Sequence, residues 1–249
     1  EYDNAKKYID IARDLIYDKI KMLLNESYER AYKFLLDNEN LCQLEDIIKL
    51  NKDKNKLDIK EYKQRKENLK LKKEDIKDYE RIIGIRKIIL TEEEDYNTSL
   101  DLSQICRKKD NFTICMLVLN RLQNNLKNCD PDITARVRLA MGKFIHDDND
   151  DPNNLDKAIA ELEKILNINI NKVCDPLKSK IYCYYGMWCA EKIEIKLNEK
   201  EVNNILKDLQ LSTKYNQSNY KAWHSYALLN YKFFESGEKT KINYAINAI

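Results

Sequence analysis

One acidic stretch has the spacing of the first three oxygen ligands of a calcium-binding loop, namely Asp147, Asn149 and Asp151. Such a loop also needs glycine at its sixth position and glutamate at its twelfth. This chain has Pro152 and Ala158 at those positions. We therefore expect no calcium site, and we interpret residues 146–152 as an acidic loop that leads into the next helix.

A cysteine and a histidine could together form a thiol nucleophile and its general base. The chain has two histidines, His146 and His224, and its cysteines include Cys183 and Cys189. A cysteine nucleophile needs a base within reach and usually a third group that orients the base. The pattern favours a packed, hydrogen-bonded His224 over a catalytic one. Cysteine and histidine never stand at metal-ligand spacing, so we predict no catalytic residue and no metal site.

A lysine-rich run from Lys52 to Lys77 could contact nucleic acid or an acidic membrane surface. Glutamate and aspartate are interleaved with its lysines, which is typical of a solvated helix with i,i+4 ion pairs. Tyr62 alone offers too little aromatic surface to stack single-stranded bases. The whole chain has 44 basic and 42 acidic side chains and a formal net charge of +2. This balance argues against a dedicated nucleic-acid binder.

The composition decides the fold class. Only 4 glycines and 3 prolines occur in 249 residues, whereas ordinary usage is about 7% and 5%. Sheets and glycine-rich phosphate loops need turns that this chain lacks. The sequence therefore predicts an all-α protein. It has no run of about 18 apolar residues that would predict a transmembrane helix, and no secretory signal pattern.

Seven scattered cysteines, with no C-x-x-C pair, suggest reduced core thiols. We expect such a chain in the cytoplasm, with the nucleus or a peripheral place at a membrane as alternatives. The first residue, Glu1, and the apolar helical pattern that continues to Ile249 lead us to expect a piece of a longer protein.

Apolar residues recur at steps of three and four along most of the chain. This periodicity predicts helices over 4–24, from about 26 onward, and near 41–48, followed by a mobile loop over 51–58. Further helices are predicted over 96–107, 112–126, 133–145, 153–168, 177–197, 201–215, 219–235 and 239–249. Short connections make consecutive helices antiparallel. We expect one helical-repeat domain over 1–249, a degenerate tetratricopeptide-like α-solenoid.

The helix predicted over 219–235 carries large rings and one small residue on one stripe: Trp223, Tyr226, Ala227 and Tyr231. Leucines and phenylalanines fill much of the remaining circumference. A helix that is apolar nearly all round is usually buried between neighbours. We therefore expect Trp223 to be a core residue.

Several motifs resemble one family. Tyr220-Lys221-Ala222-Trp223-His224 resembles the Y-K-A-W-H signature of the FAT domain of Tor-type kinases, which are relatives of the phosphatidylinositol 3-kinases. The run from Ala5 to Leu15 resembles A-x-x-x-I-D-x-A-R-D-L, and the run from Glu26 to Tyr32 resembles E-S-Y-x-R-A-Y of that family. Leu44-Glu-Asp-Ile-Ile resembles its L-E-E-V-I. Tyr220, Trp223 and His224 are the structural signature residues.

The resemblance implies the C-terminal part of a FAT domain, with a kinase domain beyond residue 249. No catalytic loop of H-R-D-x-x-x-x-N type and no D-F-G occurs here. The chain would then be a non-catalytic scaffold of a serine/threonine protein kinase. It would buttress the kinase domain of the same parent chain and offer surface to accessory subunits. The alternative is a free-standing tetratricopeptide-like adaptor that binds peptides.

The resemblance also implies a pocket for inositol hexakisphosphate, which FAT domains of Tor kinases line with lysine and arginine. Lys221 corresponds to one basic position of the family, and Lys108 and Lys143 fall at two more. Phosphates take charge-assisted hydrogen bonds from such side chains. Three other basic positions of the family differ here, and they are occupied by Tyr182, Gly186 and Asp101.

Overall fold

The fold is all-α. A computed structural model of the chain describes residues 2–53, 75–88, 95–126, 129–148, 152–168, 170–193 and 199–235. Every regular element in these ranges is a helix, which confirms the fold class. The chain divides into two compact units, 1–105 and 106–249. Neighbouring helices within each unit pack as adjacent pairs, as in an α-solenoid.

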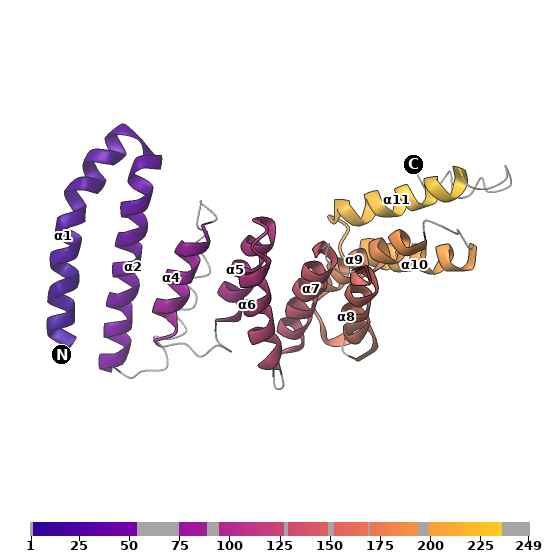
Figure 1. The fold of residues 1–249 in the computed structure, drawn as a ribbon, viewed down its shortest axis with the longest axis horizontal. Coiled ribbons are helices and arrows are strands. Elements are labelled where there is room, and N and C mark those ends of the chain that lie inside the picture. Colours follow the sequence, from indigo (N-terminus) through magenta and orange to yellow (C-terminus); the bar gives the residue numbers. More distant parts are fainter. Residues whose placement is uncertain are drawn as a thin grey trace. The chain divides into compact units, whose positions relative to one another are not determined.

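The first unit begins with a long helical hairpin. α1 (Tyr2–Glu26) and α2 (Tyr28–Asp53) are separated only by Ser27 and lie side by side (Figure 1). Ile9, Ala31 and Leu36 are among the residues buried in this unit. The guanidinium of Arg13 on α1 donates to Glu45 on α2 at 2.7 Å. This ion pair links the two helices.

The prediction of a separate helix near 41–48 is wrong, because α2 continues through it without a break. No glycine or proline occurs between residues 28 and 53, so nothing in the sequence ends the helix there. The predicted loop over 51–58 is also wrong for its first three residues, which are helical. The remainder of that loop, with most of the lysine-rich run, lies outside the described residues.

A buried ion pair holds the next two helices of the first unit together. α4 (Ile76–Arg86) ends at Arg86, and α5 (Tyr96–Lys108) starts directly after Asp95. Arg86 Nη1 lies 3.1 Å from Asp95 Oδ1, and both side chains are almost fully buried. Thr98 donates its hydroxyl to the same carboxylate oxygen at 2.6 Å and is also bonded to Arg86.

The second unit starts with the last residues of α5, from Cys106 to Lys108. It also contains α6 (Phe112–Asn124), α7 (Pro131–Asp147), α8 (Asn154–Ile168), the short 3₁₀ helix η2 (Ile170–Lys172), α9 (Asp175–Ile193), α10 (Glu199–Tyr215) and α11 (Tyr220–Glu235). These bounds lie within a few residues of the predicted ones. α9 is central, because it contacts α7, α8, α10 and α11. The predicted loop over 146–152 is partly helical, since α7 includes His146 and Asp147. The helix predicted over 239–249 lies outside the described residues.

Helices α9 and α10 pack closely because small residues face each other. Ser179 donates to the carbonyl oxygen of Ser212 at 2.8 Å, and Ser212 donates back to that of Ser179 at 2.6 Å. Asn219, just before α11, donates to the Ser179 hydroxyl at 2.9 Å. Further along, Gly186 on α9 lies against Leu209 on α10. These contacts also tie the start of α11 to α9.

Gly186→Ala should therefore destabilise the protein. A Cβ at this position would lie 2.8 Å from two side-chain carbons of the fully buried Leu209, and overpacking of this kind costs about 1–3 kcal/mol. Gly84→Ala on α4 is the matched control, since a Cβ there meets nothing within 4 Å. We expect it to stabilise by about 0.5–1 kcal/mol. Chemical unfolding measures both, and equal effects would contradict this packing.

Asp132 on α7 caps the start of α9. Its carboxylate accepts the backbone N–H of Cys174, the residue directly before α9, at 2.8 Å. This hydrogen bond is the largest cause that lowers the pKa of Asp132 in the folded protein. The carboxylate therefore stabilises the fold above the unfolded pKa of about 3.9, and this stabilisation is lost as the pH falls through the lower, folded pKa.

Asp132→Asn should consequently be less stable than the parent chain at neutral pH. The difference should shrink progressively when the pH is lowered below about 4. Urea unfolding of both proteins across this range tests the linkage. A stability difference that is independent of pH would show that the Asp132 carboxylate has no such role.

Helix α11 has one buried and one open face, and the prediction that Trp223 is a core residue is wrong. Ala222, Leu229 and Phe233 are buried, whereas Trp223 is 48% exposed. The Trp223 indole N–H donates to the backbone oxygen of Gln217, in the turn before α11, at 3.0 Å. His224 is likewise exposed rather than packed. The reason is that α9 and α10 contact α11 on its other side.

Candidate functional site

Two lysines from different helices converge on one tyrosine ring. Tyr184 lies on α9, with Lys143 of α7 and Lys221 of α11 close to it. The Lys143 ammonium is 4.0 Å from the ring centroid, and the Lys221 ammonium is 4.3 Å from it. Both distances are within the range of cation–π contacts. The central position of α9 between α7 and α11 brings the three side chains together.

This cluster is short of negative charge. Burial lowers the pKa of Lys143, Tyr184 offsets this in part, and the charges of Arg107 and Lys221 lower the pKa further. No carboxylate is among the groups that shift it. Burial alone would raise the pKa of Tyr184, but the charges of Lys143 and Lys221 outweigh this effect and lower it. Positive charge confined in this way favours binding of an anion.

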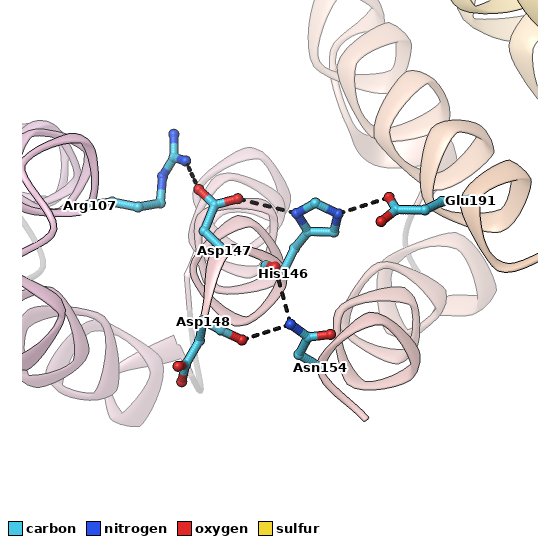
Figure 2. A network of polar contacts seen from close by, with 6 residues as sticks. All are labelled: Arg107, His146, Asp147, Asp148, Asn154 and Glu191. Atoms are coloured by element: carbon cyan, nitrogen blue, oxygen red, sulfur yellow. Dashed lines mark hydrogen bonds and ion pairs between the residues drawn. The ribbon is translucent and has the colours of Figure 1, made fainter. Parts of the chain in front are cut away.

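A polar network at the end of α7 engages the carboxylates of Asp147 and Glu191. Figure 2 shows His146 between Asp147 and Glu191, with Arg107 bonded to the other oxygen of Asp147. The His146 ring nitrogens lie 3.2 Å from Asp147 and 3.1 Å from Glu191. The ring also stacks on Trp188, with centroids 5.1 Å apart.

The Asn154 amide, at the start of α8, closes this network. It donates to the backbone oxygens of His146 and Asp148 at 3.3 and 2.7 Å. Together these bonds connect α7 with α8, α9 and the end of α5 (Figure 2). Asp147, a residue of the rejected calcium loop, thus has a structural role here.

Comparison with known proteins places the chain in a family. The family model of the FAT domain matches residues 1–249. The chain belongs to the FAT domain family. It is 25% identical to the serine/threonine-protein kinase TOR2 of Saccharomyces cerevisiae, over 93% of this chain and 10% of that protein. It is 24% identical to the serine/threonine-protein kinase mTor of Drosophila melanogaster, over 95% of this chain and 10% of that protein.

A third relative of this FAT domain is the serine/threonine-protein kinase tor1 of Schizosaccharomyces pombe. It is 24% identical over 97% of the chain and 11% of the relative. The chain therefore spans about a tenth of the length of these curated relatives. The matches confirm the resemblance to Tor-type kinases that the sequence motifs predicted.

The structure brings together two of the three basic residues predicted to line a site in this FAT domain. Lys143 and Lys221 share Tyr184, whereas Lys108 is exposed at the end of α5. Its neighbour Arg107 acts on Lys143 instead. Sequence reasoning missed Tyr184 and Arg107. No sequence pattern indicated Tyr184, because its place beside two lysines depends on tertiary packing.

Two of the positions at which this chain lacks a basic residue of the family face away from the cluster. Tyr182 stacks on Tyr215 of α10, with centroids 5.9 Å apart, and Gly186 packs against Leu209 of α10. Both lie on the opposite side of α9 from Tyr184, as their spacing of two residues from it requires. The absence of basic side chains at these two positions therefore leaves the cluster of Lys143, Tyr184 and Lys221 unchanged.

The thiols of Cys183 and Cys189 in this FAT domain are poorly suited to nucleophilic chemistry. Burial raises the pKa of the Cys183 thiol and raises that of Cys189 to about 11, so both are protonated at neutral pH. The described part of the chain has no group of three or more metal-ligating side chains. None of the helices in that part is long and apolar enough to cross a membrane.

Proposed function

We propose that this FAT domain is a non-catalytic helical scaffold of a Tor-like serine/threonine protein kinase. It packs against the kinase domain of the same parent chain and offers surface to accessory subunits. The match of the FAT family model to residues 1–249 carries this proposal. The names of the relatives as serine/threonine-protein kinases, and the tenth of their length that the chain spans, agree with it.

Uncovered apolar faces favour this scaffold over a free-standing adaptor. On α1, Tyr8, Leu15 and Met22 recur at heptad spacing and are all exposed. On α11, Tyr220 and Tyr231 are exposed in the same way. Large exposed apolar surfaces mark sites of contact with other protein surfaces.

The scaffold role is tested in the parent kinase with Leu15→Asp. A carboxylate in the centre of the exposed α1 face should weaken any contact made there and reduce both kinase activity and co-purification of subunits. Lys21→Asp, on another side of α1, is the control that also introduces a carboxylate. If the two variants retain activity and subunits equally, the α1 face is not a contact surface of the parent.

The basic cluster supports a second role, binding of inositol hexakisphosphate. The convergence of Lys143 and Lys221 on Tyr184 is the observation that favours it. A ligand that binds only the folded state stabilises it by about 2.7 kcal/mol at about 100-fold excess over Kd. Screening by salt should weaken the effect.

Inositol hexakisphosphate should therefore raise the unfolding midpoint of the chain, and Lys143→Glu or Lys221→Glu should abolish the rise. Lys7→Glu, an exposed position on α1, is the charge-matched control and should retain the rise. Lys108→Glu should have a smaller effect than Lys221→Glu, because Lys108 is exposed at the end of α5. An unchanged midpoint with ligand, or equal losses in all four variants, would remove this site.

A further inference from the structure

Lys143 has no carboxylate partner among the described residues. Its ammonium lies over the Tyr184 ring, and the Lys221 ammonium lies over the same ring. Among those residues, no aspartate or glutamate forms an ion pair with either lysine. Lys178 is different, because its ammonium pairs with Asp175 at 3.0 Å. The amine of Lys143 is thus held by an aromatic ring and not by an anion.

The surroundings of Lys143 also favour its neutral form. Its neighbours in the chain, Gly142 and Phe144, are buried, and Lys143 itself is only partly exposed. This burial is the largest cause that lowers the pKa of Lys143, nearby positive charge lowers it further, and Tyr184 offsets part of the effect. A lysine becomes a nucleophile when it is desolvated or stands next to another cation. Lys143 meets both conditions.

The cations around Lys143 select the charge of a molecule that could react with it. Lys221 lies 4.3 Å from the centroid of the shared ring, and Arg107 acts on Lys143 from the end of α5. A phosphate group takes charge-assisted hydrogen bonds from such side chains. A phosphate held by Lys221 leaves the Lys143 nitrogen to react with another group of the same molecule. Carbonyl groups are suitable, since lysine amines form Schiff bases with them.

We propose that Lys143 is a modification site, whose nitrogen forms an imine with an aldehyde that carries a phosphate group. The nitrogen lone pair adds to the carbonyl carbon, and a C–N bond forms. The carbonyl oxygen then leaves as water with the two amine protons, so that a C=N bond replaces the C=O bond. No electrons are gained or lost. The proposal rests on the geometry of the basic cluster and not on binding of inositol hexakisphosphate.

Pyridoxal phosphate, which has both an aldehyde and a phosphate, is the probe for the intact chain. After a short incubation, borohydride reduces the imine to a stable amine, and peptide mass spectrometry identifies the labelled lysines. Lys143 should be labelled faster than Lys7, which is exposed on α1. This preference should shrink with pyridoxal, which lacks the phosphate, and in Lys221→Gln, which lacks one neighbouring cation.

Lys143→Arg keeps the positive charge but has no amine that forms the imine, so the rapidly labelled fraction should be lost. Lys7→Arg is the matched control and should keep that fraction. The proposal is overturned if Lys143 is labelled no faster than Lys7, or if pyridoxal shows the same preference. It is also overturned if Lys143→Arg keeps the rapidly labelled fraction.

The same proteins separate this modification from the polyphosphate role. Lys143→Arg retains the charge of the cluster, so inositol hexakisphosphate should still raise its unfolding midpoint while the rapid labelling is lost. If inositol hexakisphosphate leaves the midpoint of the parent chain unchanged, the polyphosphate role fails. Preferential labelling of Lys143 in that chain would still support the imine.

Discussion

Asp95→Ala should lower the free energy of unfolding by about 3–5 kcal/mol, because it leaves a buried charge without its partner. The side chains of Arg86 and Asp95 are 10% and 13% exposed, so water cannot replace the lost carboxylate. Thr98 also loses the acceptor of its hydroxyl. Urea unfolding followed by circular dichroism measures the effect.

The control for Asp95→Ala is Asp37→Ala. Asp37 pairs with Arg81 at 3.9 Å, and both side chains are well exposed. An exposed pair of this kind contributes about 0–1 kcal/mol. Comparable losses in the two variants would mean that burial of the Arg86–Asp95 pair does not determine its importance to the first unit.

Leu119→Ala on α6 should cost about 2–5 kcal/mol, since it removes buried methyl groups and leaves a cavity. Leu119 is fully buried, whereas Leu117, two residues away on the same helix, is 65% exposed. Leu117→Ala should therefore change the stability by no more than about 0.5 kcal/mol. The two variants change the same residue type on the same helix, and the two positions differ only in burial.

Thermal and urea unfolding of the two leucine variants should give clearly separated midpoints. If Leu117→Ala is as destabilising as Leu119→Ala, then α6 packs with a different face inward. The same measurement reports on the second unit, because α6 packs on α7, and α7 supplies Lys143 of the basic cluster.

The fold class could be predicted from composition, because a chain so poor in glycine and proline has few ways to turn except between helices. The helices of the second unit were predicted to within a few residues, since apolar periodicity there is strong. The hairpin α1–α2 was predicted less well. Its second helix has no breaker residue between 28 and 53, although the apolar periodicity predicted a separate helix near 41–48.

Trp223 shows what a helical pattern leaves open. The stripe through Trp223, Ala227 and Tyr231 predicts that these residues share a face, and they do. It does not say which of two apolar faces meets α9 and α10. The buried face is the one with Ala222, Leu229 and Phe233, and this choice depends on tertiary packing that one helix does not specify.

The basic cluster was only half predictable. Lys143 and Lys221 came from resemblance to a family, since 78 residues separate them in the sequence and spacing alone cannot bring them together. Tyr184 had no signal, because its role depends on α9 lying between α7 and α11. Arg107 is adjacent to the predicted Lys108, and the end of α5 is oriented so that Arg107 reaches Asp147 instead.

The most direct test of the central claim is a phosphotransfer assay on the purified chain and on its parent kinase, side by side. Both are incubated with labelled ATP and a generic protein substrate. The scaffold account predicts transfer by the parent and none by the chain of residues 1–249, whose sequence has neither the H-R-D-x-x-x-x-N nor the D-F-G motif of protein kinases. Phosphate transfer by the isolated chain, freed of contaminating kinases, would contradict the account.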